Sequence, residues 1–210
     1  MKKLIHKIYM FFGHIVCRLC LAYAVVRDKL CPPKADTILF VAHPDDDALF
    51  FHSFIKKEKP YVVLLMTGWS VRRLICFFKV MKYYGVKCRA YDLVSAKVSR
   101  NDPKWFERLD NEIKNSLHAG HFTCVATHNE EGEYGHPSHR AVHAAVKKLA
   151  PCDLITPVFK SVIRNYPLPA DVLKDKEYVF RKLYFTEAWT IDELPEWMEN
   201  EQLTVCPKEK

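Results

Sequence analysis

Two short stretches of this 210-residue chain gather side chains that can bind a metal ion and move protons. The first is His43-Pro44-Asp45-Asp46-Asp47, which directly follows the apolar residues 38–42. The second is the segment 127–143, which contains four histidines and several glutamates. Imidazole and carboxylate groups form the ligand sets that divalent metal ions prefer in hydrolytic sites. The sequence therefore indicates a metal site assembled from two distant segments.

The first stretch is expected to lie on a tight turn between a strand and a helix. Residues 38–42 are short and apolar throughout, which predicts a buried strand. Pro44 cannot continue a central strand but suits the first turn of a helix, whose positive end favours acidic side chains. Because ligands of open α/β sheets bind at the carboxyl ends of strands, we expect His43 at a binding site. The alternative is that the aspartates only cap the helix 48–56.

The second stretch repeats this arrangement. Val125 and Ala126 lead into it like the end of a strand, and two glycines mark a loop. Pro137 then starts a helix that is expected to run to about Leu149. His136 stands at the cap of this helix, and His139 and His143 follow on one of its faces.

Together, Ala42-His43-Pro44-Asp45-Asp46 and Gly135-His136-Pro137-Ser138-His139 resemble the two signatures of the PIG-L/LmbE-like zinc de-N-acetylases. That family removes acetyl groups from N-acetylglucosamine units attached to inositol lipids, thiol precursors, antibiotics or other glycans. The resemblance covers roughly residues 36–157. It implies hydrolysis of the N-acetyl group of an amino-sugar conjugate, with release of acetate.

The resemblance also implies a three-ligand zinc site. By motif position the ligands are His43, Asp46 and His139, which leaves a fourth coordination position for water or substrate. Two histidines and one carboxylate also suit Fe²⁺, so both metals remain candidates.

The resemblance assigns roles around the metal as well. Asp45 becomes the general base, and His136 polarises or protonates the substrate. Tyr134 matches a tyrosine that assists at the carbonyl in some members, and Arg73 matches an arginine that contacts substrate.

Three positions depart from the family pattern. Asp47 is shorter than the acid that usually follows the second aspartate, and Cys76 stands where a glutamate is common. Ser138 replaces the acid between the paired histidines, which removes a partner that would set the basicity of His136. A metal hydrolase for another amide or ester, and a sugar-binding family member without activity, are the alternative functions.

The elements that would position these residues alternate between strands and helices. Strands are expected at 37–42, 61–67, 86–93, 122–127 and 153–156, and helices at 48–57, 71–84, 102–119 and 137–149. This alternation predicts an α/β fold with a Rossmann-like, mostly parallel sheet flanked by helices. The aromatic segment Tyr178–Trp189 suits either a strand or a helix. No Gly-x-Gly-x-x-Gly follows the first strand, so a dinucleotide cofactor is not indicated.

Residues 1–34 differ in composition from the deacetylase domain expected at 35–210. They hold seven Lys and Arg residues against one Asp, which is +6 of the total charge of +7. The remainder of the chain is nearly neutral, which argues against a nucleic-acid partner. Two prolines at 32–33 form a linker after an apolar, basic helix.

The N-terminal helix has several interpretations. Lys3, Lys7, His14 and Arg18 share one stripe of an otherwise apolar helix, which is typical of a helix that lies in an anionic membrane surface. A cleaved signal peptide, a membrane anchor and packing against the protein's own core are the alternatives. We expect a cytoplasmic protein that is peripheral to the membrane, because eight scattered cysteines suit a reducing compartment.

Overall fold

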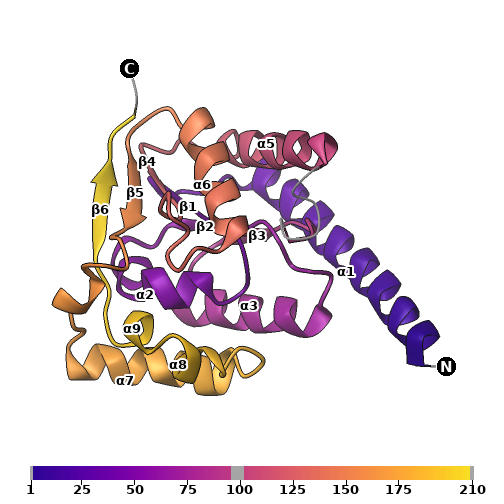
Figure 1. The fold of residues 1–210 in the computed structure, drawn as a ribbon. Helices are drawn as coiled ribbons and strands as arrows, with labels where there is room; N and C mark the ends of the chain where they lie inside the picture. The colour runs from indigo at the N-terminus through magenta and orange to yellow at the C-terminus, as the bar shows by residue number, and fades with distance from the viewer. Residues whose placement is uncertain (1, 96–101, 209–210) are drawn as a thin grey trace.

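The computed structural model describes residues 2–95 and 102–208, with side chains from residue 8 onward. Six strands in this part of the chain form one sheet in the order β3-β2-β1-β4-β5-β6 (Figure 1). The strands are β1 Thr37–Val41, β2 Tyr61–Leu64, β3 Cys88–Ala90, β4 Cys124–Ala126, β5 Leu154–Pro157 and β6 Leu203–Cys206. β1 to β5 pair in parallel, whereas β6 is antiparallel to β5. The Rossmann-like, mostly parallel sheet that the sequence predicts is therefore confirmed.

The strand order reverses at β1 and β4, which lie side by side although they are far apart in sequence. Ile38 of β1 pairs with Tyr61 of β2 on one side and with Val125 of β4 on the other. The connections from β1 and β4 leave the sheet in opposite directions, and in open α/β sheets ligands bind at the carboxyl ends of the strands on either side of such a reversal. The histidine and aspartate segment 43–47 follows β1, and the histidine-containing segment 127–143 follows β4.

Helices cover both faces of the sheet (Figure 1). One face carries α2 Asp46–Glu58 and α3 Val71–Tyr84, and the other carries α5 Pro103–Leu117 and α6 Pro137–Leu149. Successive residues of β1 point to opposite faces, so Leu39 packs toward α2 and α3 while Phe40 packs toward α5 and α6. Both faces are buried, which explains why the strand is an uninterrupted apolar run.

The helix ends follow local signals, which is why α3 and α6 have the predicted bounds. The Ser70 hydroxyl accepts the backbone N–H of Arg73 and so caps the first turn of α3. Gly85 ends the same helix in the left-handed conformation, with φ of 69°. Pro137 opens α6 at a position where no backbone donor is needed.

The C-terminal region is helical until the last strand. It contains η1 Ile163–Asn165, α7 Ala170–Tyr178, the π-helical turn η2 Val179–Leu183, α8 Thr190–Glu193 and α9 Pro195–Met198. The segment Tyr178–Trp189 therefore contains helix, a π-helical turn and loop, not strand. β6 was not expected from the sequence, because it is a short, partly exposed edge strand without a buried alternating pattern.

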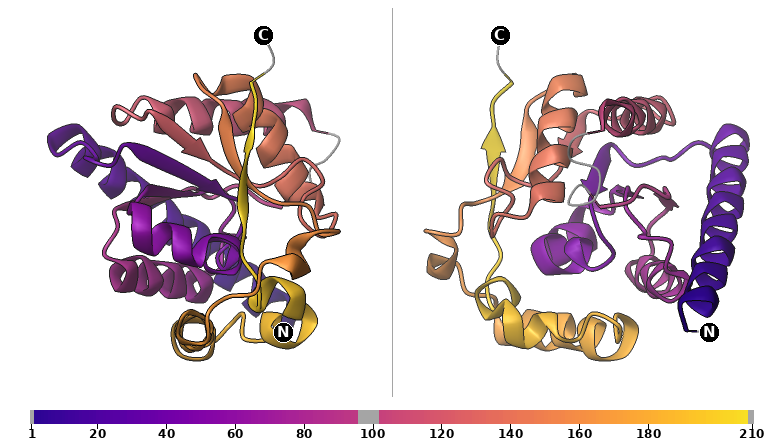
Figure 2. Two further views of the ribbon diagram at one scale, coloured as in Figure 1. Left: turned by 90° about the vertical axis from the view of Figure 1, so that its left-hand side faces the viewer. Right: turned by 45° about the vertical axis from the view of Figure 1, so that its right-hand side comes forward.

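The N-terminal helix α1 Lys2–Leu30 runs along the outside of the domain, where it contacts β3 and α3 (Figure 2). One face packs inward, with Cys17 and Ala24 buried. Asp28 is also buried, and its carboxylate accepts hydrogen bonds from Tyr61 Oη at 2.5 Å and Arg89 Nη2 at 2.6 Å. These contacts attach the C-terminal half of α1 to β2 and β3.

The outer face of α1 is apolar and exposed. It presents Ile8, Phe11, Phe12, Ile15, Leu19, Tyr23, Val26 and Leu30. Ile8–Leu30 is long and apolar enough to cross a membrane, a criterion that signal sequences and core helices also meet. His14 departs from the expected basic stripe, since its Nδ1 lies 2.9 Å from a carboxylate oxygen of Asp92 and its ring contacts Trp69. The side chains of Lys3 and Lys7 lie outside the described residues.

Candidate metal centre

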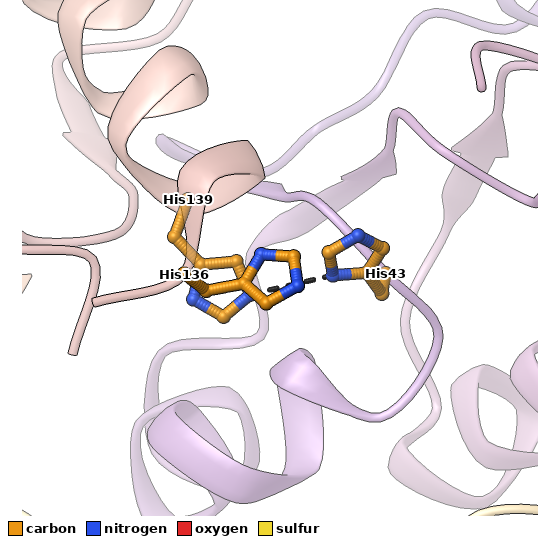
Figure 3. Close-up of side chains that lie close together, drawn as sticks. All are labelled: His43, His136 and His139. Atoms are coloured by element: carbon orange, nitrogen blue, oxygen red, sulfur yellow. Dashed lines mark hydrogen bonds between the residues drawn. The ribbon is translucent and has the colours of Figure 1, made fainter. Parts of the chain in front are cut away.

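The two motifs meet at the carboxyl ends of β1 and β4, where the three predicted metal ligands lie together. His139 Nε2 is 3.3 Å from His43 Nδ1 and 3.3 Å from Asp46 Oδ1. His43 Nδ1 lies 3.3 Å from Asp46 Oδ2. Figure 3 shows the rings of His43 and His139 facing each other, with His136 alongside. The turn after β1 and the first turn of α6 supply all of these groups.

These separations fit a tetrahedral metal ion. Nitrogen and oxygen ligands bind zinc at about 2.0–2.1 Å, so neighbouring ligand atoms of a tetrahedral site lie about 3.3–3.4 Å apart. The distance between the His43 and His139 nitrogens matches this spacing, each nitrogen lies at the same distance from one of the two Asp46 oxygens, and all three side chains are at least largely buried. The donor set therefore fits a divalent ion such as Zn²⁺ or Fe²⁺.

His128 and His136 also lie within reach of this cluster. Ligand atoms of His43, His136 and His139 fall within 4.8 Å of one another, and so do those of Asp46, His128 and His139. The His128 Nε2 atom already accepts the backbone N–H of Ala42 at 2.9 Å, so its lone pair points to the strand. His128 is thus a poor ligand in this arrangement.

Glu133 lies behind the cluster and was not identified from the sequence. Its Oε2 atom is 2.6 Å from His139 Nδ1 and 3.0 Å from His128 Nδ1, and its Oε1 accepts the N–H of Asn129 at 2.8 Å. Burial opposes ionisation, but His128 and the hydrogen bond from His139 lower the pKa of Glu133 to about 2. An ionised carboxylate in this place fixes the tautomer of His139 and leaves Nε2 as a metal ligand.

Glu133 is the carboxylate partner of His139 and His128, whereas the acid expected at position 138 would have been a partner of His136. The carboxylate beside His139 therefore comes from the loop before α6. Ser138 is buried, and its hydroxyl lies 3.0 Å from that of Ser95.

Asp45 occupies the turn itself, in a strained backbone conformation with φ of 111°. Its carboxylate lies 3.3 Å from Thr190 Oγ1 and 3.6 Å from Arg73 Nη2. Burial, together with the charge of Asp46, raises the pKa of Asp45 well above its usual value, although Arg73 opposes this shift. A carboxylate with a raised pKa is a stronger base, as proton abstraction from water requires.

Arg73 reaches the site from α3, as the sequence suggested. Its Nε donates to Glu187 Oε1 at 2.7 Å, and its Nη2 donates to the carbonyl of Pro44 at 3.1 Å. Glu187 was not predicted. The preceding residue, Thr186, contacts the sulfur of Cys76 at 3.7 Å. The carboxylate beside Arg73 is therefore supplied by the C-terminal region.

Asp47 also has a partner from the C-terminal region. The hydroxyl of Tyr184, which is fully buried, donates to Asp47 Oδ1 at 2.6 Å. Burial raises the pKa of Asp47 to about 7, although this hydrogen bond opposes the shift. The shorter acid thus still anchors the first turn of α2.

His136 and Tyr134 lie at the more exposed side of the cluster. His136 Nδ1 accepts the N–H of Ser138 at 3.2 Å, so the neutral ring carries its proton on Nε2. The ring centroid of His136 is 4.7 Å from that of His43. Tyr134 is 37% exposed, with its ring 5.8 Å from that of His136. Both residues can present donors to a bound ligand.

Comparisons with known proteins support the fold. No family model matches the sequence. The uncharacterized protein L374 of Acanthamoeba polyphaga mimivirus is 26% identical over 141 residues, which are 59% of this chain and 61% of that relative. The chain therefore spans less than two thirds of the relative's length.

Two solved structures are similar to this one. The antimicrobial reagent A40926 pseudoaglycone deacetylase Dbv21 matches with a TM-score of 0.56 and 14% identity, over 78% of this chain and 86% of that one. The conserved protein TT1542 from Thermus thermophilus matches with a TM-score of 0.50 and 15% identity, over 84% of this chain and 96% of that one. At these identities, the likeness establishes a shared fold.

Proposed function

We propose that the protein is a zinc-dependent hydrolase that removes the acetyl group from an N-acetylated amino-sugar conjugate. The observation that carries this proposal is the cluster of His43, His139 and Asp46, in which the two imidazole nitrogens are 3.3 Å apart and each lies 3.3 Å from one oxygen of the Asp46 carboxylate, with the Asp45 carboxylate nearby. The fold shared with a deacetylase of an antibiotic pseudoaglycone supports the same reaction class.

The residues of and around this cluster have different roles in amide hydrolysis. A bound zinc ion would polarise the acetyl carbonyl and acidify a water molecule. Asp45 accepts the proton of the attacking water, because its carboxylate is buried, basic and not a ligand of the proposed set. The Nε2–H of His136 donates to the carbonyl oxygen as negative charge develops there, and Tyr134 assists from the exposed side. Arg73 binds the substrate next to Asp45.

The leaving nitrogen must gain a proton before the bond to the acetyl carbon breaks. Asp45 supplies the proton that it took from water, which regenerates its carboxylate, while the neutral ring of His136 keeps its Nε2 proton and polarises the substrate as a hydrogen-bond donor. The products are acetate and a free amino sugar.

We also propose that α1 rests on an anionic membrane surface and that the substrate conjugate is lipid-linked or part of the cell envelope. The exposed apolar face of α1 and the net charge of +6 in residues 1–34 support this partner. Arg18 and Lys29 are exposed on the same helix and can reach lipid headgroups. This arrangement corresponds to a cytoplasmic protein peripheral to the membrane.

The decisive experiment measures metal content and acetate release together. The protein purified without chelator should carry about one divalent ion per chain and release acetate from members of a panel of N-acetylhexosamine conjugates. His139→Ala should lose the metal. His143→Ala on the same helix should keep it, since His143 Nδ1 donates to the carbonyl of His128.

Other results would support a different function. If the protein released acetate from simple esters or acyclic amides but not from N-acetylated sugars, it would be a metal hydrolase for another class of substrate. Sugar binding without any acetate release would indicate an inactive binding protein. Retention of metal by His139→Ala with loss in His143→Ala would contradict the ligand assignment.

A further inference from the structure

Trp189 is a large apolar side chain left exposed beside the most buried groups of the site. It is 52% exposed, whereas Trp105 and Trp197 are at most 5% exposed. Its neighbour in sequence, Thr190, contacts the Asp45 carboxylate at 3.3 Å. The indole therefore stands at the edge of the catalytic cluster and not on a remote surface.

The indole ring is held in a defined orientation. Its Nε1 donates to Glu187 Oε2 at 3.3 Å, while the other oxygen of Glu187 accepts from Arg73 Nε at 2.7 Å. Glu187 is itself 5% exposed, so this pair of hydrogen bonds is shielded from water. One carboxylate thus sets the positions of Trp189 and Arg73 relative to each other.

A second exposed aromatic ring reaches the cluster through different residues. Tyr134 packs at 5.5 Å from the ring of His139 and at 6.5 Å from the ring of Phe50. Trp189 approaches through Glu187 and Arg73. A ligand whose reacting group lies at Asp45 would therefore meet an aromatic ring from each of two segments.

We propose that Trp189 is the platform on which the pyranose ring of the substrate stacks, with Tyr134 as the second aromatic contact. The inference rests on the proposed deacetylase function and deepens it by naming a hexopyranose as the recognised group. A pyranose ring presents a continuous face of C–H groups that covers the apolar face of an indole, while its hydroxyls remain at the edge to meet polar groups. Arg73, fixed beside the indole, is a suitable donor to those hydroxyls.

This arrangement has a consequence for selectivity. Stacking covers the exposed indole and keeps water away from Asp45, so ring binding and positioning of the acetamido group occur together. An acyclic N-acetyl amide lacks the flat C–H face and gains nothing from Trp189. The preference for sugar substrates over acyclic amides should therefore appear as tighter binding and a lower KM, with a similar kcat.

The test uses the full-length, metal-loaded protein and the methyl glycoside of N-acetylglucosamine as probe. Sugar binding is followed by tryptophan fluorescence and by ligand-observed NMR, and acetate release gives kcat and KM. Trp189→Ala and Trp189→Leu should each weaken sugar binding and raise KM roughly tenfold. Both should leave kcat and metal content near those of the wild type. Trp189→Phe should retain most of the affinity, because it keeps a flat aromatic face.

Phe185→Ala is the matched control. Phe185 is 55% exposed and lies four residues earlier in sequence, in the turn between η2 and α8, so its loss should leave sugar binding unchanged. If Trp189→Ala and Trp189→Leu both kept the wild-type affinity and KM, Trp189 would not be the platform. The proposed function would still hold in that case, provided that these proteins released acetate from the sugar. Loss of sugar binding in those variants, in a protein that releases no acetate from any conjugate, would uphold the platform and overturn the proposed function.

Discussion

Gly13 of the N-terminal helix lies so close to Trp69 that a β-carbon on Gly13 would stand 1.9 Å from the Trp69 carbonyl oxygen. Trp69 has φ of 57°, a left-handed conformation that non-glycine residues seldom adopt. Cys17 contacts the same loop, with its sulfur 3.4 Å from Thr67 Oγ1. The loop leads into α3, which carries Arg73. The N-terminal helix is therefore packed against a segment that supports the candidate site.

A side chain at position 13 should disturb this packing. Gly13→Val should push α1 away from residues 67–70 and raise KM several-fold through Arg73, with metal content unchanged. Ala22→Val introduces the same side chain on the exposed face of α1 and should have little effect. Steady-state kinetics with the Trp69 environment followed by near-UV circular dichroism would check this. Equal behaviour of the two variants would show that α1 does not influence Arg73.

The membrane proposal needs a variant that leaves the inner face of α1 intact. Deletion of residues 1–33 would remove Asp28, the ion-pair partner of Arg89 on β3, and would therefore disturb the domain as well as the outer face of α1. Phe12→Glu with Leu19→Glu changes only exposed positions. This double variant should lose binding to anionic vesicles while unfolding at nearly the same temperature as the wild type.

Vesicle sedimentation at low and high salt measures this prediction. Raised salt should weaken binding of the wild type, because attraction to the surface is screened over about 8–10 Å. Unchanged vesicle binding by Phe12→Glu with Leu19→Glu would contradict the membrane proposal. A mature protein that begins near Val25 would replace it with the signal-peptide interpretation.

The parts of the site that sequence reasoning found are those whose signals are local. His43, Asp45 and Asp46 follow one strand, and His136 and His139 open one helix, so short-range turn and cap signals predicted their positions. Glu133 was missed because nothing in the sequence separates it from Glu131, which is exposed. Glu133 differs from Glu131 in being buried and in having two histidine partners, and both properties depend on the fold.

The C-terminal contribution to the site has no local signal at all. Tyr184, Glu187 and Thr190 reach Asp47, Arg73 and Asp45 across more than a hundred residues of sequence. The π-helical turn η2 comes directly before them, and such turns are frequent at functional sites. Long-range contacts of this kind depend on how the sheet and α7 pack, which one sequence does not specify.

Folding stability should depend on pH through His52, which is fully buried on α2. Its Nδ1 lies 2.9 Å from Tyr84 Oη, and its Nε2 lies 3.0 Å from Asp175 Oδ2. Burial, reinforced by the charges of Lys176 and Lys56 against that of Asp175, lowers the pKa of His52 from 6.5 to about 4. Between these values the unfolded chain binds a proton that the folded protein does not, so stability falls as the pH falls through this window.

The expected loss between pH 7 and pH 5 is about 2 kcal/mol from His52 alone. His52→Gln keeps a hydrogen-bonding group but cannot titrate in this range. Urea unfolding at the two pH values should therefore show a smaller pH dependence in His52→Gln than in the wild type. The same loss in both proteins would mean that other groups control acid sensitivity.

Glu133 should control metal affinity from outside the ligand set. Glu133→Gln removes the negative charge that accepts from both His139 and His128, so the metal should bind about 10–100-fold more weakly. Glu131→Gln makes the same chemical change two residues away on an exposed side chain and should have no such effect. Competition with a chelating dye measures both affinities. Equal metal affinities in Glu133→Gln and Glu131→Gln would show that Glu133 does not control metal binding.

Asp45 and Asp46 are adjacent and identical in chemistry, yet they face different partners. Asp46 lies 3.3 Å from both His43 and His139, whereas Asp45 faces Thr190 and Arg73. Asp46→Ala should therefore lower metal affinity. Asp45→Asn should keep metal content near normal and cut kcat by about 10²–10⁴-fold, the usual contribution of a positioned general base.

Metal analysis and steady-state kinetics of the two variants test this division of roles. Of the two variants, only Asp45→Asn should show a lower kcat while it keeps its metal, because an amide cannot accept the proton of the attacking water. If Asp45→Asn lost the metal while Asp46→Ala kept both metal and activity, the two roles would be exchanged. The proposed mechanism would then fail at its first proton transfer, although the fold and the ligand histidines would be unaffected.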